Sequence, residues 1–373
     1  MVGRRICCYL VLILSFAPLR ADEVIRVNQL GYLPESIKVA VFLSTAEAGF
    51  PFFTLHDTLT DEVVFTGEQV EFPAGGWGLK RAFRLDFSGM ASPGAYYLRA
   101  GGARSPDFRI NADIYRGTAD FILNYLRQQR CGYNPFLRAS CHLHDGVIVD
   151  HPTRSGEVID VTGGWHDASD YLQYSTTSVN TLFQLMFAYR SFPEIYGDYC
   201  DGRGEPGSNG VPDILDEIRW GLDWALKMNP APGEFYNQIA DDRDHVGFRL
   251  PSQDRADYGM GEHRPVYFVT GRPQGLGKYR NRSTGVSSIA GKFASAFALG
   301  AMVFSDSDPG YARRLKAKAL EAWEFALSDP GYTQTACNVS PYFYEESNFV
   351  DDLDLAATQL FRLTGDRGNL EAG

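Results

Sequence analysis

The stretch Gly-Gly-Trp-His-Asp-Ala-Ser-Asp-Tyr, residues 163–171, places two carboxylates three residues apart beside a histidine. Such a pair can act on one water molecule, because one carboxylate takes its proton while the other holds it in position. Hydrolysis of a glycosidic bond with inversion needs this kind of base together with a more distant carboxylic acid. Asp167 and Asp170 are therefore catalytic candidates. The pattern also fits a simpler structure, in which Asp170 caps a helix that starts near Tyr171.

Three aromatic residues surround the two aspartates: Trp165, Tyr171 and Tyr174. The C–H-bearing faces of sugar rings are apolar, so aromatic rings of this kind can stack on them. We therefore take these three side chains as candidates for substrate binding.

A second group of side chains is suited to a metal ion. Cys131, Cys141, His142 and His166 offer two thiolates and two imidazoles, the donor set of a closed tetrahedral zinc site. Such a zinc would fix the residue after His166, which is Asp167. The alternative is a disulfide between Cys131 and Cys141, which export from the cell permits.

A third segment, Asp241 to His245, is dense in carboxylates. Oxygen ligands at this density suggest calcium, and a solvated acidic loop is the alternative. Residues 271–280 look like a phosphate-binding loop, but their glycine spacing is wrong and Tyr279 stands where serine or threonine must follow the lysine. Nucleotide binding is excluded there.

The first 21 residues have the pattern of a secretory signal peptide. Arg4 and Arg5 precede an apolar run over residues 6–18, and Ala21 lies just before a plausible cleavage point. We therefore expect a secreted or periplasmic protein that has no stable membrane anchor. The formal net charge is −11, and removal of this segment makes it more negative, so a nucleic-acid partner is excluded. We expect a monomer.

The rest of the chain divides into a segment with strand-like patterns and a segment with helical patterns. Residues 22–110 hold about seven short runs rich in β-branched and aromatic residues, separated by turn signals, which predicts an immunoglobulin-like β-sandwich. Residues 111–373 have helical periodicity. The first predicted helix spans 113–130 and has Tyr115, Ala119, Ile122 and Leu126 on its apolar face. Five more are expected after Tyr171, Pro212, Val286, Gly310 and Asn348, the last ending at Gly365 as a C-cap.

Taken in order, these segments resemble glycoside hydrolase family 9. The resemblance rests on "VIRVNQLGYLP", "QRCGYNP", "CHLHDG", "GGWHDASDY", "GVPDILDEIRWGLDWALKM" and "DDLDLAATQLFRLTGD", and it covers essentially the whole chain after residue 21. It implies an (α/α)₆ barrel behind the sandwich and inverting hydrolysis of β-1,4-glucan. Asp170 matches the general base and Asp167 the aspartate that helps hold the water. Cys131, Cys141, His142 and His166 match the ligands of zinc-containing members, and Asp241, Asp244 and His245 resemble a recurring segment in a family where calcium is common.

Two departures from the family pattern concern catalysis. The family usually has glycine where Ser169 stands, so a hydroxyl is added beside the site. Its general acid is a glutamate that typically follows asparagine, and this sequence contains no Asn-Glu pair. About six helices follow the sandwich where the full barrel needs twelve. We therefore expect a C-terminally truncated fragment whose activity alone is severely reduced, because general acid–base assistance contributes roughly 10²–10⁴-fold.

Three other functions remain open at this stage. The substrate could be another β-glucan, a cello-oligosaccharide or a chitosan-like polymer. The protein could bind carbohydrate without catalysis. It could also be a zinc hydrolase, although four protein ligands leave no open coordination position for catalysis.

Overall fold

The computed structural model describes residues 23–47, 49–76, 78–340 and 344–373, and the predicted signal peptide lies outside them. The chain separates into two compact units, residues 1–116 and 117–373, so the boundary falls a few residues after the predicted one. Within the described residues, no helix is both long and apolar enough to cross a bilayer.

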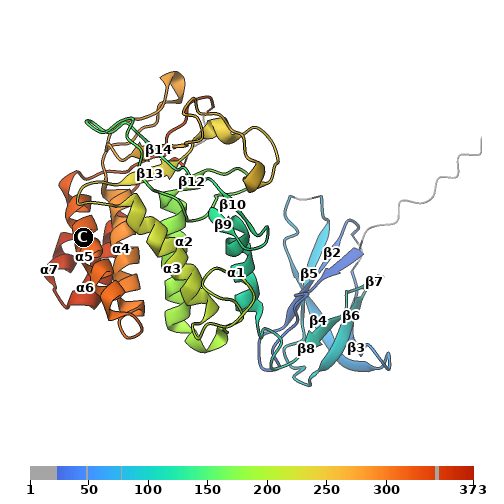
Figure 1. Cartoon of the computed structure of the whole chain (residues 1–373). Helices are drawn as coiled ribbons and strands as arrows, with labels where there is room; N and C mark the ends of the chain where they lie inside the picture. The colour runs from blue at the N-terminus through green and yellow to red at the C-terminus, as the bar shows by residue number, and fades with distance from the viewer. Residues whose placement is uncertain (1–22, 48, 77, 341–343) are drawn as a thin grey trace, which may run out of the picture. The chain divides into compact units, whose positions relative to one another are not determined.

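The first unit is built from antiparallel strands that pair in the order β1-β2-β5-β4-β3-β6-β7, with β8 also on β6 (Figure 1). Strand β4 pairs with β3 through its first part and with β5 through its last four residues, so it links two halves of the sheet. Side chains from both halves form one buried core. The strands are β1 (Glu23–Arg26), β2 (Val39–Ser44), β3 (Phe52–Asp57), β4 (Val63–Phe72), β5 (Arg81–Asp86), β6 (Gly94–Ala100), β7 (Ala103–Arg104) and β8 (Phe108–Ile110).

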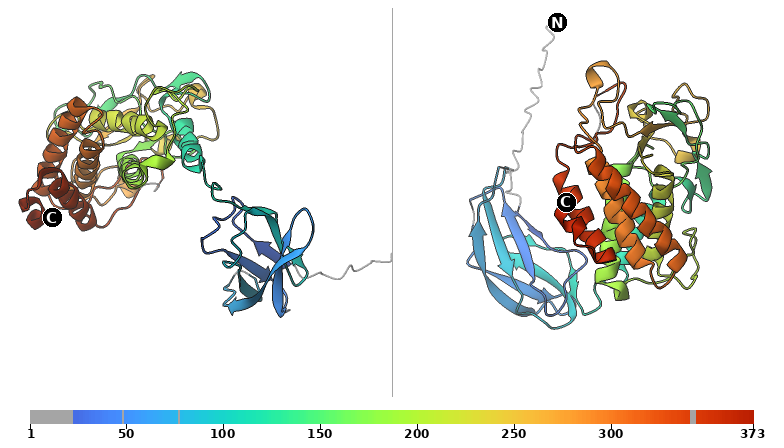
Figure 2. Two further views of the ribbon diagram at one scale, coloured as in Figure 1. Left: turned by 90° about the horizontal axis from the view of Figure 1, so that it is seen from below. Right: turned by 90° about the vertical axis from the view of Figure 1, so that its left-hand side faces the viewer.

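The second unit is mainly helical, and its strands and long loops gather at one end of the helices (Figure 1). Two further views show these helices packed against one another (Figure 2). The helices are α1 (Thr118–Gln129), α2 (Ser175–Ser191), α3 (Asp213–Met228), α4 (Ser287–Val303), α5 (Pro309–Ser328), α6 (Val350–Thr364) and α7 (Gly368–Ala372). The strands are β9 (Gly132–Asn134), β10 (Ala139–Cys141), β11 (Val147–Val149), β12 (Gln173–Tyr174), β13 (Tyr236–Ile239) and β14 (Pro265–Phe268).

Local signals account for several helix ends. Helix α3 begins directly after Pro212, carries Asp213 and Asp216 in its first turn and ends with Lys227 in its last turn, which suits the helix dipole. Helix α6 ends at Gly365, whose φ of 76° lets its N–H bond back to the carbonyl of Phe361. The C-cap predicted at Gly365 is confirmed.

The predicted apolar face of the first helix is wrong at Tyr115 and Ile122, although Leu126 packs partly buried against the core. In α1 the buried residues are Asp120, Leu123 and Arg127, while the side chain of Ile122 is 66% exposed. The reason is an ionic contact with the neighbouring helix: Arg127 pairs with Asp213 of α3 at 2.9 Å. A buried ion pair thus sets the orientation of α1, and periodicity of apolar residues alone cannot detect that.

The pairing of β12 with β13 brings the two loops of the site together. These strands run antiparallel and Gln173 lies opposite Ile239. The chain before β12 and the chain after β13 therefore leave the sheet at the same end. This places residues 163–172 beside residues 240–249.

Candidate active site and metal cluster

The loop 163–171 is attached to the C-terminal end of α1 by backbone hydrogen bonds. The N–H of Cys131 donates to the carbonyl of Gly164 at 3.0 Å, and the N–H of His166 donates to that of Gln129 at 2.8 Å. The hairpin of β9 and β10 places Cys141 opposite Gly132. These contacts bring the β9–β10 hairpin and the loop 163–171 together. They hold His166 beside Cys131 and Cys141.

Trp165 is a packing residue, and the prediction that it stacks on sugar is wrong. Its side chain is buried against α3, and its Nε1–H donates to Glu217 Oε1 at 2.8 Å. A Cβ atom at Gly221 would lie 2.1 Å from the ring, so this glycine is what lets the indole approach the helix. No face of the ring is free for a ligand.

Tyr171 and Tyr174 are also buried, which contradicts their predicted role as open sugar platforms. The Tyr171 hydroxyl donates to the carbonyl of Arg249, and its ring lies beside the His166 ring with centroids 4.8 Å apart. The Tyr174 ring meets that of Tyr344 edge-on at 4.9 Å. Both tyrosines are therefore packing residues of the loop.

Asp170 does not cap a helix. Helix α2 begins at Ser175, and the residue in its N-cap position is Tyr174, which has no side-chain cap. Asp170 Oδ2 instead lies 2.9 Å from His245 Nε2. Its Oδ1 is buried and has no hydrogen-bond partner among the described residues. Burial raises the pKa of Asp170, and the bond from His245 opposes that rise.

Asp167 is held by two hydroxyl groups from distant parts of the chain. Thr177 Oγ1 of α2 donates to Asp167 Oδ1 at 3.1 Å, and the Tyr344 hydroxyl donates to Oδ2 at 2.9 Å. These bonds fix the plane of the carboxylate. Tyr344 was not identified from the sequence, because it lies 177 residues away and in no recognised motif.

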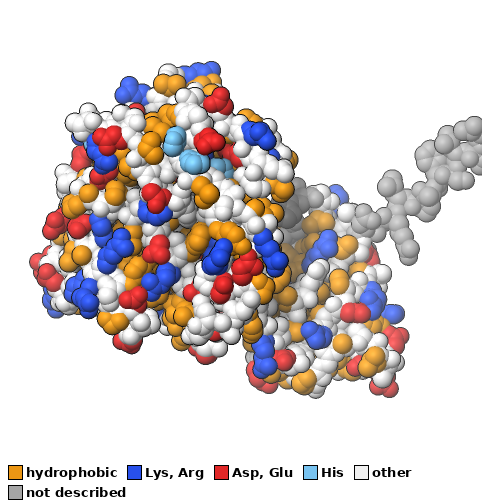
Figure 3. Space-filling model, viewed as in Figure 1, with side chains coloured by type: hydrophobic (Ala, Val, Ile, Leu, Met, Phe, Trp, Pro, Cys, Tyr) orange, Lys and Arg blue, Asp and Glu red, His pale blue; other side chains and the backbone are white. Residues whose placement is uncertain are grey.

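A pocket of about 260 Å³ opens beside Asp170. Ser169 lines it, as does Phe248, whose side chain is 95% exposed. Phe248 therefore presents the aromatic face that the buried tyrosines do not. On the side of the second unit seen in Figure 3, histidine side chains gather next to acidic ones at the loop end.

The segment Asp241 to His245 is not a solvated loop, and two of its aspartates are paired with arginines. Asp241 and Asp244 are fully buried, and their carboxylates bind Arg243 at 2.5 Å and Arg249 at 2.7 Å. His245 faces Asp170. Because arginines neutralise Asp241 and Asp244, these two carboxylates do not converge on a cation, and the structure gives no support for the calcium prediction here.

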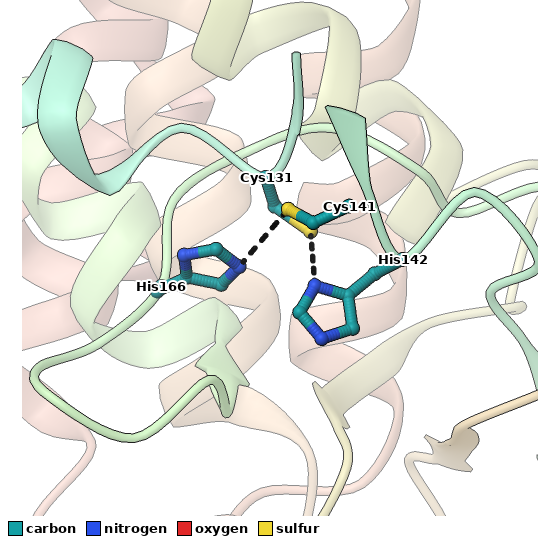
Figure 4. A group of neighbouring side chains, drawn as sticks. All are labelled: Cys131, Cys141, His142 and His166. Atoms are coloured by element: carbon teal, nitrogen blue, oxygen red, sulfur yellow. Dashed lines mark hydrogen bonds between the residues drawn. The ribbon is translucent and has the colours of Figure 1, made fainter. Parts of the chain in front are cut away.

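Cys131, Cys141, His142 and His166 do converge. One ligand atom from each lies within 4.8 Å of those of the others, and the four side chains point toward one another (Figure 4). Cys131 Sγ is 3.7 Å from His142 Nδ1, and Cys141 Sγ is 3.9 Å from His166 Nε2. Both cysteines are free thiols, so the alternative disulfide is not formed. Two sulfur and two imidazole donors around one point fit a tetrahedral metal ion.

The surroundings of the cluster also suit a metal ion. The second ring nitrogen of His142, Nε2, lies 3.0 Å from Asp254 Oδ2, and such carboxylate partners orient ligating histidines. Arg264 Nη2 lies 3.5 Å from Cys131 Sγ and 2.6 Å from Asp145 Oδ2. Burial raises the pKa of Cys131, and the nearby arginine opposes that rise. Neither Asp254 nor Arg264 carries a sequence signal that we recognised.

Comparison with known proteins identifies the family of this chain. The family model described as Glycosyl hydrolase family 9 matches residues 115–372, and that described as Cellulase N-terminal ig-like domain matches residues 20–105. The chain is 30% identical over 232 residues to a xyloglucan-specific endo-beta-1,4-glucanase of Bacteroides ovatus, covering 58% of this chain and 38% of the relative. It is 27% identical over 305 residues to a cellodextrinase of Butyrivibrio fibrisolvens, covering 79% and 50%.

Solved structures similar to this chain also come from glycoside hydrolase family 9. A metagenome-derived glycoside hydrolase family 9 endoglucanase has a TM-score of 0.76 and 31% identity, covering 94% of this chain and 63% of that one. A Zn-binding triple mutant of a family 9 endoglucanase has a TM-score of 0.72 and 27% identity, covering 90% and 61%. The chain spans 38% to 50% of the length of the two curated relatives named above. A β-rich domain followed by a helical one is thereby confirmed, and the chain belongs to glycoside hydrolase family 9.

Proposed function

We propose that the protein is an inverting glycoside hydrolase that cleaves β-1,4-glucan, with Asp170 as the general base. The single observation that carries this is the state of the Asp170 carboxylate. Oδ2 is held by His245, Oδ1 has no hydrogen-bond partner among the described residues, and Asp170 lines a pocket. An oriented carboxylate with one unpaired oxygen is what activation of a water molecule requires.

The remaining side chains have separate roles in this mechanism. Asp167, fixed by Thr177 and Tyr344, accepts the second hydrogen of the attacking water and orients it. Asp170 removes a proton from that water as it attacks the anomeric carbon. The leaving oxygen takes a proton from a carboxylic acid, which in inverting enzymes lies about 6.5–9.5 Å from the base. Asp170 is the base of that pair.

The substrate class follows from the relatives together with the pocket. The two named relatives are a xyloglucan-specific endo-beta-1,4-glucanase and a cellodextrinase. Exposed Phe248 at the pocket offers a stacking surface for a pyranose ring. We propose a β-1,4-linked glucan or cello-oligosaccharide, and another β-glucan as the second candidate. Secretion is part of this proposal, because such polymers lie outside the cell.

The Cys131, Cys141, His142 and His166 cluster is proposed to hold zinc in a structural role. Four protein ligands close the coordination sphere, so this ion would stabilise the loop instead of activating water. A zinc-hydrolase mechanism is therefore not favoured. Zinc bound there would fix His166 and the start of the loop that carries Asp167 and Asp170.

The architecture of each unit can be proposed in more detail than the family assignment gives. We propose that the first unit is an immunoglobulin-like sandwich, since its two half-sheets share one core. We propose that helices α1 to α6 belong to an (α/α)₆ barrel. Support for this comes from the sequential packing of α2 on α3 and α4, and of α4 on α5 and α6.

The stereochemistry of the first product tests the proposed mechanism. The full-length product of the gene is incubated with cellopentaose, and the anomeric proton signals are followed by NMR. Attack by water on the face opposite the leaving oxygen predicts that the α-anomer is formed first. Early appearance of the β-anomer would contradict the mechanism, and absence of hydrolysis would favour a protein that only binds carbohydrate.

Replacement of His245 by glutamine tests how the base is tuned. Burial raises the pKa of Asp170, and the hydrogen bond and charge of His245 oppose that rise. Removing the imidazole will raise the pKa further. Because the base works only when ionised, the acid limb of the pH–rate profile will move to higher pH. An acid limb at the wild-type position in His245→Gln would show that the imidazole does not act on the base. The matched control is His151→Gln, a histidine on another loop.

A further inference from the structure

Lys292 is the only charged residue in α4, a helix that is otherwise made of small and apolar side chains. Its side chain is 17% exposed. An ammonium group in such a place is costly unless it is paired and hydrogen-bonded. The reason for its presence must therefore lie in its partners.

Those partners are two carboxylates from a different part of the chain. Lys292 Nζ lies 2.7 Å from Asp352 Oδ2 in α6 and 2.9 Å from Glu346 Oε1 in the segment before α6. Burial raises the pKa of Asp352 to about 6, and the ammonium opposes that rise. Lys292 therefore ties α4 to α6 and also to the segment that contains Glu346.

Glu346 lies close to the two residues whose hydroxyl groups hold Asp167, through a hydrogen bond to the neighbour of one and along the chain to the other. Its Oε1 accepts a hydrogen bond from Thr176 Oγ1 at 2.5 Å, and the neighbouring Thr177 donates to Asp167. Tyr344, two residues before Glu346, donates to the other oxygen of Asp167. Together with the covalent chain from Thr176 to Thr177 and from Tyr344 to Glu346, these hydrogen bonds form a ring that starts at the carboxylate of Asp167 and returns to it.

Two backbone contacts help to fix this ring. The carbonyl of Glu346 accepts a bond from Gln334 Nε2 at 2.6 Å, and the N–H of Tyr344 donates to Thr335 Oγ1 at 2.8 Å. The segment 344–346 is therefore held by its backbone, while its acidic side chain is held by Lys292. Loss of the ammonium removes the ion pair that holds the Glu346 side chain against α4, so Glu346 can shift.

We propose that Lys292 is a positioning residue: by anchoring Glu346 it sets Tyr344 and Thr177 and so fixes the orientation of Asp167. The expected effect on reaction rate rests on the proposed function. The effect of Lys292 on the position of Asp167 rests on the contacts alone.

A double-mutant cycle tests it on the full-length gene product. Lys292→Met, Tyr344→Phe and the double variant are compared for kcat and KM on cellopentaose. Displacement of a water-orienting carboxylate will lower kcat by about 10- to 100-fold in Lys292→Met, while KM stays within about twofold. Because Lys292 acts through Tyr344, adding Lys292→Met to Tyr344→Phe will change kcat much less than it does alone. Equal losses in both backgrounds would overturn the proposal.

The matched control is Lys318→Met. Lys318 lies in α5, its side chain is 13% exposed, and it pairs with Glu321 at 2.9 Å, away from the aspartates. The Lys318→Met substitution will leave kcat near the wild-type value. A similar loss of kcat in this variant would show that Lys292 contributes only general stability. If Lys292→Met does not fold, Glu346→Gln replaces it, since glutamine keeps the acceptor for Thr176 and removes only the charge.

A crystal structure of the variant separates this inference from the proposed function. In Lys292→Met the distance from the Tyr344 hydroxyl to Asp167 Oδ2 will exceed hydrogen-bond range, compared with 2.9 Å in the native chain. An unchanged distance would overturn the inference even in a protein that hydrolyses glucan. If the native protein hydrolyses no glucan, the proposed function fails while this distance still decides the role of Lys292.

Discussion

Replacement of Asp170 by asparagine will lower kcat on cellopentaose by about 10²–10⁴-fold, the range that general-base assistance contributes. Asparagine keeps the shape of the side chain and can still accept the bond from His245, but it cannot take a proton from water. Binding of the oligosaccharide will be retained, because the pocket and Phe248 are unchanged. The measurement is kcat and Kd on the full-length gene product.

The same variant separates catalysis from folding. Burial raises the pKa of Asp170, which means that its charged form is disfavoured in the folded protein. A neutral amide will therefore leave Tm unchanged or raise it. The control is Asp354→Asn on the exposed side of α6, which will keep full activity. A large fall in Tm with Asp170→Asn, or full activity, would contradict the assignment of this residue as the base.

Replacement of Cys131 by serine will remove zinc and destabilise the second unit by several kcal/mol. Zinc contributes about 10–16 kcal/mol to zinc-finger peptides, and a smaller value is expected here because the helical core does not depend on the ion. The wild-type protein will contain one zinc ion per chain by elemental analysis. The serine variant will have little zinc and a lower Tm, and treatment with a strong chelator will lower the wild-type Tm in the same way.

Cys200→Ser provides the control for that prediction. Cys200 is a free cysteine outside the cluster, so its variant will keep both zinc and Tm. One zinc per chain in Cys131→Ser would show that the ion binds elsewhere. A wild-type protein without zinc whose Cys131 and Cys141 have formed a disulfide would favour the alternative that the compartment permits.

Much of the fold was predictable from local patterns. The helices expected after Pro212, Val286 and Asn348 are α3, α4 and α6, and the C-cap at Gly365 is present. These signals are short-range, since proline, glycine and helical periodicity act within a few residues. The face of α1 was not predictable, because the pairing of Arg127 with Asp213 depends on the position of another helix.

The site was predictable to a smaller extent. Residue types and spacing singled out the four residues of the metal cluster and the two aspartates, the resemblance matched them to family roles, and the structure brings the four ligands together. The roles of the surrounding side chains were assigned less well. Trp165 satisfies its indole N–H inside the core, and Asp241 is neutralised by Arg243, so both are structural. Residue type alone does not distinguish an aromatic platform from a packed ring.

The partners of the aspartates could not be predicted because they are distant in sequence. His245 lies 75 residues from Asp170, and Tyr344 lies 177 residues from Asp167. The antiparallel pairing of β12 with β13 creates the first contact, and the anchoring of Glu346 supports the second. Both contacts depend on tertiary structure, and the nine-residue motif 163–171 contains no information about it.

The central claim is that Asp170 activates the attacking water, and rescue of Asp170→Ala by azide tests it most directly. The alanine variant leaves space for a small anion that needs no base. With an activated cello-oligosaccharide, azide will restore turnover and give the α-glycosyl azide, because it enters from the side of the missing carboxylate. Absence of rescue, or formation of the β-glycosyl azide, would contradict the assignment of Asp170 as the base of an inverting reaction.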